Sequence, residues 1–333
     1  MGKKIYTNQL VEYVGEEITE LFFVNNLINN HNRQGTIWTT VQITDKTGTV
    51  NAKIWSEFSE EDAEECQNQV CRLTGKVDIY NGVPGIAISK LSLAENYDES
   101  DFAKELNEEE KKKAYEDLDK YISSVSNKGY QNLLRAVFSE RNREKMASLP
   151  AGIKSHHCYN GGLLCHTLEV VRMAEGLMKA RLPFGKEGTT NMDRDLLVTA
   201  GLLHDIGKIT AYRSFPMADR TVRGKLLNPS LEGVAFVVAY NGNLANEERV
   251  TDTAELLHCM TAAHKEVYGG IKPCMQEAIL LRMANEASIK EDGYREAFLL
   301  DAKKHPGKER QFIYSSMHEN VLYGKREKEG EPA

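Results

Sequence analysis

Residues 202–208 read LLHDIGK, with His204 directly before Asp205 in an otherwise apolar stretch. The apolar spacing predicts a helix in which His204 lies on the buried face. A buried carboxylate is costly unless it is paired or bound to a cation. Lys208 supplies a cation beside the pair, and Gly207 lets the predicted helix end there. The segment therefore predicts either a satisfied polar core or a metal site.

A second buried histidine favours the metal site. Residues 161–177, GGLLCHTLEVVRMAEGL, predict a helix with His166 on its apolar stripe. A lone inward histidine is more often a hydrogen-bonded core residue than a ligand. Two imidazoles and a carboxylate carried on two helices, however, form a suitable partial ligand set for Mn²⁺, Fe²⁺, Zn²⁺ or Mg²⁺. His156 and His157 precede the helix and either line this site or form a polar turn.

The composition limits the class of protein. With 333 residues the chain is long enough for two domains, and 41% hydrophobic and 27% charged residues are typical of a soluble globular protein. The sequence shows no apolar run of membrane-spanning length and no signal-peptide pattern, so we expect a cytoplasmic protein without a membrane partner. The net charge of −7 argues against binding nucleic acid through a broad basic surface, so any such contact must be local.

The first 95 residues predict an all-β domain. Five short strands are separated by turn signals, and a polar helix-prone segment follows the third strand. The pair Asn81-Gly82 is a strong hairpin signal between the last two strands. This order is that of an OB-fold barrel. The predicted strands are 18–28, 36–43, 49–55, 70–80 and 83–94.

The rest of the chain predicts helices. Residues 96–112 are acidic and nearly free of large apolar side chains, which indicates a linker or an exposed helix start. Residues 113–322 show helical spacing, and residues 323–333 are too polar to pack and are expected to be disordered. The fold prediction is therefore a multidomain protein with an all-β OB-fold barrel followed by an all-α domain.

Two tryptophans lie on the outside of the predicted barrel. Alternation places Thr39, Val41, Ala52 and similar side chains inside, and it leaves a second set outside that consists of Trp38, Lys53 and Trp55. A turn at residues 45–48 brings Trp38 opposite Trp55. On this strand pair OB-folds stack single-stranded bases, each worth ~1–3 kcal/mol. The alternative is that both rings pack beneath the next domain. The inward set is Ile37, Thr39, Val41, Ile43, Val50, Ala52 and Ile54.

Beyond these patterns, a histidine on one helix and HDIGK on the next resemble the HD phosphohydrolase superfamily, whose members hydrolyse phosphoesters with metal ions. An OB-fold with VQITDKTGTVNAKIW, followed by LPAGIKSHHCYNGGLLCHTLEV and LLVTAGLLHDIGK, resembles the YhaM-type 3′–5′ exoribonucleases. The resemblance covers residues 15–290 and is most specific over residues 148–208.

The resemblance implies a metal-dependent exonuclease. His166, His204 and Asp205 would be metal ligands, and Lys208 would neighbour the scissile phosphate. Asp205 and Lys208 are thus the predicted catalytic residues. The implied cofactor is a divalent metal ion, Mn²⁺ first, with Mg²⁺, Fe²⁺ or Zn²⁺ as alternatives. The implied partner is single-stranded RNA or DNA, and a homo-oligomer is compatible with the sequence.

Two positions depart from the family pattern. Asn228 and Pro229 occupy the place of a glycine-histidine pair, which removes a ligand of a second metal. Asn285 occupies the place of the aspartate that closes the metal shell, and it brings an oxygen without a charge. Further candidates for the site are Glu286, which is adjacent to Asn285, and the two mid-domain histidines His258 and His264, for which a surface position is the alternative.

Three functions remain open at the level of sequence. The first is a 3′–5′ exonuclease that holds a single strand on the tryptophan face and cuts it at the HD site. The second is a non-catalytic single-strand-binding protein with a degenerate HD domain, which Asn285 and Pro229 favour. The third is an HD phosphohydrolase acting on nucleotides, or an HD domain of the mobile-element relaxase type.

Overall fold

The computed structural model describes residues 3–31, 37–55, 58–80, 82–103, 105–153, 156–180, 192–214, 218–304 and 310–324. The chain divides into two compact units, Met1–Glu105 with Ser214–Met217, and Leu106–Arg213 with Ala218–Ala333. The division falls inside the acidic stretch 96–112, where a short helix η2 (Glu99–Asp101) precedes α2 (Glu108–Ser124). The finer boundaries at residues 95, 113 and 323 stay predictions.

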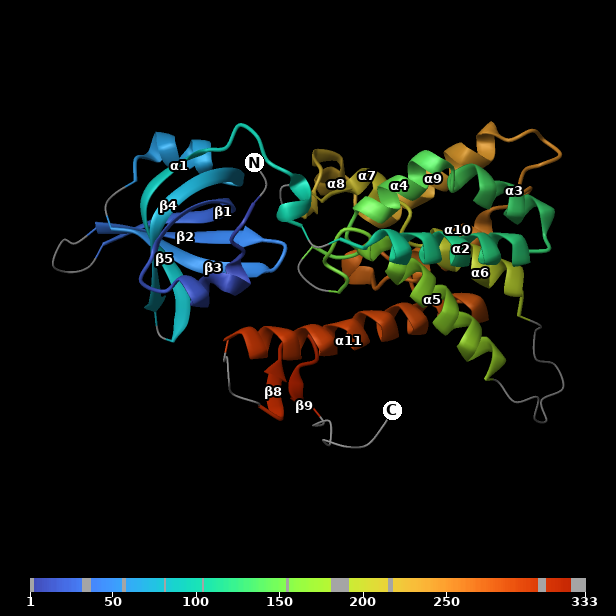
Figure 1. The fold of residues 1–333 in the computed structure, drawn as a ribbon. Helices are drawn as coiled ribbons and strands as arrows, with labels where there is room; N and C mark the ends of the chain where they lie inside the picture. Colours follow the sequence, from blue (N-terminus) through green and yellow to red (C-terminus); the bar gives the residue numbers. More distant parts are fainter. Residues whose placement is uncertain are drawn as a thin grey trace. The chain divides into compact units, whose positions relative to one another are not determined.

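The first unit contains a closed five-stranded barrel with the order β1-β2-β3-β5-β4. Neighbouring strands are antiparallel except β3 and β5, which are parallel. Helix α1 follows β3 in the chain and lies beside the barrel (Figure 1). This is the OB-fold order, so the predicted barrel is confirmed. Its elements are η1 (Thr7–Tyr13), β1 (Glu17–His31), β2 (Ile37–Asp45), β3 (Gly48–Ile54), α1 (Glu60–Cys66), β4 (Gln69–Tyr80) and β5 (Val83–Leu93).

Alternating side chains fill the barrel. Val41 and Ala52 are almost fully buried and belong to one core cluster with Phe22 and Leu73. The predicted register is confirmed, because Ile43 pairs with Val50 across β2 and β3. Each fully buried side chain of this kind contributes about 1.5–3 kcal/mol.

The inward position predicted for Ile37 is wrong, because its side chain is 38% exposed. Ile37 begins β2 and pairs with His31, the last residue of β1. This is the last described pair at that end of the two strands, so Ile37 lies at the margin of the inner layer. At the β4–β5 hairpin, Gly82 has φ +81 and Tyr80 pairs with Val83, whereas Asn81 lies outside the described residues.

The second unit is built mainly from helices around one apolar core (Figure 1). Helix α5 packs against α6 and α11, which together carry much of the buried apolar surface. Its helices are α2 (Glu108–Ser124), α3 (Lys128–Val137), α4 (Glu140–Ser148), α5 (Gly162–Lys179), α6 (Arg194–Leu203), α7 (Lys208–Ala211), α8 (Val222–Leu226), α9 (Pro229–Asn243), α10 (Ala254–Ala262), η3 (Glu266–Tyr268) and α11 (Gln276–Lys304). The predicted order, a barrel followed by a mainly helical domain, is thereby confirmed.

The HD pair lies at a helix end. Helix α6 stops before His204, which is its C-cap, residues 204–207 form turns, and Lys208 begins α7. The interpretation that Gly207 ends a longer helix is wrong. A Cβ on Gly207 would lie 2.1 Å from the carbonyl oxygen of Pro229. Glycine is needed there so that the turn can approach the start of α9 closely.

Short strands interrupt the helical unit, which the sequence did not predict. β6 (Tyr212–Arg213) pairs with β7 (Asp219–Arg220), and β8 (Phe312–Ser315) pairs with β9 (Asn320–Tyr323). The second hairpin contacts α11. Of the tail predicted to be disordered, Tyr323 ends β9, and residues 325–333 lie outside the described residues. Among the described residues no helix has the length and apolar character needed to cross a membrane.

Candidate functional site

Three side chains from two parts of the helical unit form the predicted cluster. His166 comes from α5, His204 caps α6, and Asp205 follows in the turn before α7. Their exposed fractions are 0%, 2% and 2%. One ligand atom from each lies within 4.8 Å of the others. The Nε2 atoms of His166 and His204 are 3.5 and 3.4 Å from Oδ2 of Asp205.

Lys208 partners Asp205 directly. Its Nζ donates to Oδ2 of Asp205 at 2.6 Å and to the carbonyl oxygen of Ala151 at 2.6 Å. Burial alone would raise the pKa of Asp205, but the charge of the Lys208 ammonium is the largest of the opposing effects, which together hold this pKa well below its ordinary value. Asp205 is therefore an ionised carboxylate inside the protein.

The histidines around Asp205 are neutral at pH 7. Burial lowers the pKa of His166 well below its ordinary value, and it also lowers the pKa of His204. The same cause lowers the pKa of His264 to about 4 and that of His156 to about 3. A neutral imidazole has a free lone pair, which is the form that binds metal ions.

Several buried polar atoms at this cluster lack a hydrogen-bond partner among the described residues. They are Nε2 of His166, Nε2 of His204 and Oδ1 of Asp205; Oδ1 of Asn285 on α11 is a further buried atom without a partner. Buried polar atoms are nearly always satisfied, so such a group requires an explanation. A cation coordinated by these atoms would satisfy them. The residues therefore fit a divalent metal ion.

The side-chain amide of Asn285 uses its nitrogen in a hydrogen bond and leaves its oxygen without a partner among the described residues. The residue is 3% exposed on α11, and its Nδ2 donates to the carbonyl oxygen of Ala263 at 2.9 Å. That bond assigns the amide orientation, because only the nitrogen can donate. Oδ1 is left as an unused acceptor. Asn285 thus retains the donor atom needed for a ligand, without the charge of an aspartate.

His264 joins the cluster. Its Nε2 lies 3.5 Å from Oδ1 of Asp205 and 3.3 Å from the carbonyl oxygen of His204. Its ring also stacks on that of His204, with 5.7 Å between centroids. His264 therefore lies near Oδ1 of Asp205, whereas Lys208 hydrogen-bonds to Oδ2.

Other predicted residues make contacts elsewhere. His258 accepts at Nε2 from the backbone N–H of Cys274 at 3.1 Å. Glu286 forms an ion pair with Lys265 at 3.7 Å. Asn228 caps α9 by accepting from the backbone N–H of Leu231, and Pro229 is the first residue of that helix. Asn228 and Pro229 thus serve to start a helix.

A set of polar residues behind His166 was missed by the sequence analysis. Oγ of Ser288 lies 2.9 Å from Nδ1 of His166 and 2.6 Å from Oε2 of Glu169. Nε2 of His157 lies 3.0 Å from the same Oε2, and this hydrogen bond is the main cause that lowers the pKa of Glu169. Glu169 follows His166 by one helical turn, which is the only local signal that pointed to it.

The tryptophan face of the barrel carries a basic and aromatic cluster. Trp55 is 57% exposed, and Trp38 is half-buried. Nζ of Lys53 lies 5.2 Å from the ring of Trp55 and 5.2 Å from that of Tyr80. Tyr80, at the end of β4, was not predicted as part of this face. Aromatic rings and a lysine side by side are suited to stacked bases and their phosphates.

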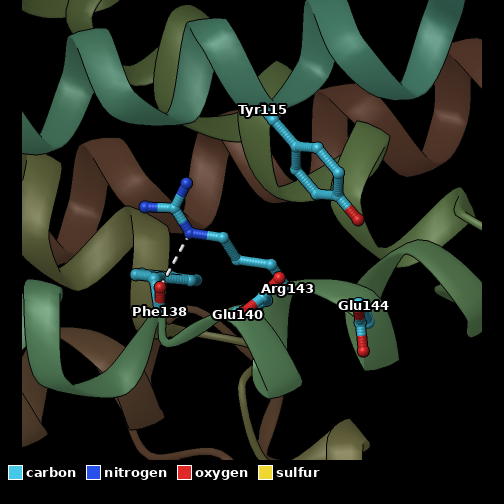
Figure 2. A pocket seen from close by; sticks show the side chains of 5 residues that line it. All are labelled: Tyr115, Phe138, Glu140, Arg143 and Glu144. Carbon is cyan, nitrogen blue, oxygen red and sulfur yellow. Dashed lines mark hydrogen bonds between the residues drawn. The ribbon is translucent and has the colours of Figure 1, made fainter.

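The helical unit also has a surface pocket that includes neither the histidine-aspartate cluster nor the tryptophan face. Figure 2 shows it on the helical unit, where the Nε of Arg143 donates to the carbonyl oxygen of Phe138 at 2.7 Å. Its other lining residues are Tyr115, Glu140 and Glu144. None of the predicted site residues lines it, so this pocket is not the candidate active site.

Comparison with known proteins identifies the class first. The HD domain family model matches residues 163–288, which run from α5 to α11. A second model, TraI_2, whose description is helicase, matches residues 98–216. The helical unit therefore contains an HD domain, the hydrolase class named for its histidine-aspartate pair.

Curated relatives narrow the class further. The protein is 26% identical over 289 residues to the 3′–5′ exoribonuclease YhaM of Geobacillus sp. (strain WCH70), covering 84% of this chain and 85% of that protein. It is 24% identical over 289 residues to the 3′–5′ exoribonuclease YhaM of Bacillus subtilis (strain 168), covering 84% and 87%. The resemblance to YhaM-type exoribonucleases is thereby confirmed, and with the HD domain it supports a nuclease.

Part of the chain was also compared with solved structures of other proteins. The second OB-fold domain of replication protein A from Methanococcus maripaludis covers 25% of this chain and 88% of that domain, at 14% identity and a TM-score of 0.20. The OB-fold assignment here rests on the strand order of the barrel itself.

Proposed function

We propose that this protein is a metal-dependent 3′–5′ exonuclease that hydrolyses single-stranded RNA. Single-stranded DNA is the second candidate substrate. The observation that carries the proposal is the buried cluster of His166, His204 and Asp205, whose unpartnered donor atoms fit a divalent metal ion. The similarity to proteins named 3′–5′ exoribonuclease supports the direction and the substrate.

The residues present would hold the metal through two imidazole nitrogens, one carboxylate and the Asn285 oxygen. When bound, a divalent ion supplies a Lewis acid for the phosphoryl group and lowers the pKa of water. Mn²⁺ suits this mixed nitrogen and oxygen set, and we propose it as the cofactor. Lys208 and His264 flank Asp205, so they place two further groups where phosphate oxygens would lie.

The barrel would bind the strand. Trp55, Trp38, Lys53 and Tyr80 provide stacking surfaces and one cation, which is enough for a local contact on a chain with net charge −7. Binding by a few aromatic side chains agrees with the absence of a broad basic surface in the sequence.

The test is cleavage of labelled strands. Purified protein is analysed for bound metal and incubated with Mn²⁺ and with 5′-labelled single-stranded RNA or DNA of the same sequence. A ladder that shortens from the 3′ end is expected, whereas release of a labelled mononucleotide at once would show the opposite direction. Strand binding without any product, in each of the four candidate metals, would instead support the non-catalytic binding protein.

Replacing Trp55 by alanine is expected to weaken binding of single-stranded RNA. A stacked base is worth ~1–3 kcal/mol, so the dissociation constant should rise roughly fivefold to a hundredfold. Fluorescence anisotropy with a labelled strand, in metal-free buffer, measures it. Tyr268, a 70% exposed aromatic on the helical unit, provides the matched control as Tyr268→Ala. Unchanged binding in both Trp55→Ala and Trp38→Ala would assign these rings to packing.

Replacing Asn285 by aspartate is expected to raise Mn²⁺ affinity by about tenfold or more, because the new carboxylate adds a charge to the metal shell. The same change removes the donor to Ala263, so the metal-free protein should lose about 1–3 kcal/mol of stability. Isothermal titration and chemical unfolding measure the two effects.

Asn142→Asp is the matched control for this change. Asn142 is also buried, and its Nδ2 donates to the carbonyl oxygen of Val137 at 2.7 Å. It should lose comparable stability without gaining metal affinity. Equal Mn²⁺ affinity in Asn285→Asp and the unchanged protein would remove Asn285 from the metal shell.

A further inference from the structure

His166 uses its two ring nitrogens for different contacts. Nε2 faces Asp205 and has no hydrogen-bond partner among the described residues. Nδ1 faces the opposite way and lies 2.9 Å from Oγ of Ser288 on α11. Both residues are completely buried, so solvent does not compete for this bond. The contact on Nδ1 therefore decides which form the imidazole takes.

The hydrogen bonds behind His166 have a fixed direction. An ionised Glu169 can only accept, so the Ser288 hydroxyl must donate to Oε2 of Glu169 across the 2.6 Å contact. Oγ of Ser288 is then free only as an acceptor, and it accepts from Nδ1–H of His166. A neutral imidazole with its proton on Nδ1 has its lone pair on Nε2. The lone pair thus faces His204 and Asp205.

We propose that Ser288 and Glu169 are positioning residues that hold His166 in the metal-binding tautomer, an inference that rests on the proposed metal centre. The arrangement is a carboxylate-histidine pair with a serine inserted between the two groups. Carboxylate partners of metal-bound histidines fix the ring orientation and raise the basicity of the ligand.

His157 holds the Glu169 end of the hydrogen-bonded chain that runs from Glu169 through Ser288 to His166. It is one of four non-glycine residues described with positive φ, at +46. Its backbone N–H donates to Oδ2 of Asp292 at 2.6 Å, and its Nε2 contacts Glu169. A Cβ on Gly162 would lie 2.0 Å from the carbonyl oxygen of His157, so glycine allows this loop to press against the start of α5. These contacts offset the unfavourable backbone conformation of His157. That conformation directs its ring toward Glu169.

A metal ion bound by His157, His166 and Glu169 is an alternative, because their ligand atoms lie within 4.8 Å of one another. The hydroxyl of Ser288 argues against that reading. It lies within hydrogen-bond distance of both His166 and Glu169, so it already occupies the space that an ion would share between them.

The test reads the tautomer of His166 in the metal-free, full-length protein. Long-range ¹H–¹⁵N spectra of histidine-labelled protein show which ring nitrogen carries the proton, and the signal that is lost in His166→Gln assigns the residue. We expect the proton on Nδ1 in the unchanged protein, a mixture of tautomers in Ser288→Ala, and recovery in Ser288→Thr. Mn²⁺ affinity should fall about tenfold to a hundredfold in Ser288→Ala and in Glu169→Gln.

Thr167→Val is the matched control. Thr167 is a buried hydroxyl on the same helix that donates to the carbonyl oxygen of Leu163, and it should change neither the tautomer nor the affinity. A proton on Nε2 in the unchanged protein, or an unchanged tautomer and affinity in Ser288→Ala, would overturn the proposal. Two Mn²⁺ ions per chain, with one lost in Glu169→Gln, would overturn it in favour of a second metal site.

Failure of the metal centre gives a different result. In that case the unchanged protein binds no Mn²⁺ and cleaves no strand, whereas the tautomer still responds to Ser288→Ala. That combination would reject the proposed function, while the role of Ser288 in setting the tautomer of His166 would still be supported.

Discussion

Asp205→Asn is expected to abolish Mn²⁺ retention and to lower the rate of strand cleavage by about a thousandfold or more. Metal ions contribute several kcal/mol to stabilising a phosphoryl transition state, and each 1.4 kcal/mol is about tenfold in rate. Among the described residues, the ionised Asp205 lies close to His166, His204, His264 and Lys208 together. Metal analysis and the labelled-strand assay measure both effects.

The control for Asp205→Asn is Asp45→Asn in the barrel. Asp45 is also buried and also faces a buried lysine, with 3.5 Å between its Oδ2 and the Nζ of Lys3. Each change breaks a buried ion pair and should cost about 3–5 kcal/mol of stability. Only Asp205→Asn should lose the metal. Cleavage at an undiminished rate by Asp205→Asn would place the chemistry at a different site.

Lys208→Met is expected to destabilise the metal-free protein strongly. It leaves the Asp205 carboxylate buried without a cation, which costs about 3–5 kcal/mol, or on the order of 10 °C in melting temperature for a unit of this size. Mn²⁺ should restore most of this loss, because the ion replaces the missing positive charge. In the unchanged protein Mn²⁺ should stabilise less, since Lys208 already compensates Asp205. Calorimetry with and without Mn²⁺ measures the difference.

Lys3→Met is the matched control for this change. Burial lowers the pKa of Lys3 to about 8, and its ammonium lies near Asp45 in the barrel. Its replacement should also change stability, but Mn²⁺ should not reverse the change. Equal stabilisation by Mn²⁺ in Lys208→Met and the unchanged protein would show that Lys208 does not share Asp205 with the metal.

The features predicted correctly are those that depend on neighbouring residues. Alternation along β2 and β3, and the turn between them, predicted the pairing of Ile43 with Val50. The same alternation left Trp55 exposed outside the barrel. Helical spacing predicted that His166 and His204 are buried. Each pattern repeats within one strand or helix, so the local chain contains the information.

The features missed depend on residues far apart in the chain. His166 and Ser288 are separated by 122 positions, and Glu169 and Ser288 by 119, yet they form one hydrogen-bonded chain between α5 and α11. A serine on a long helix carries no local signal for this role. The position of His204 at a helix end was also missed, because it follows from the close packing of Gly207 against α9.

The sequence alone therefore determined the barrel, the helical HD domain and the identity of the buried histidines and aspartate, because periodic burial and short motifs are local properties. Tertiary structure alone decided which atoms of those residues are free to bind a cation. Packing of α11 against α5 brings Ser288 to Nδ1 of His166. Lys208 pairs with Asp205 three positions away, a local contact that the sequence already indicated. Those contacts satisfy one side of each group and leave His166 Nε2 and Asp205 Oδ1 as the unpartnered donors of the site.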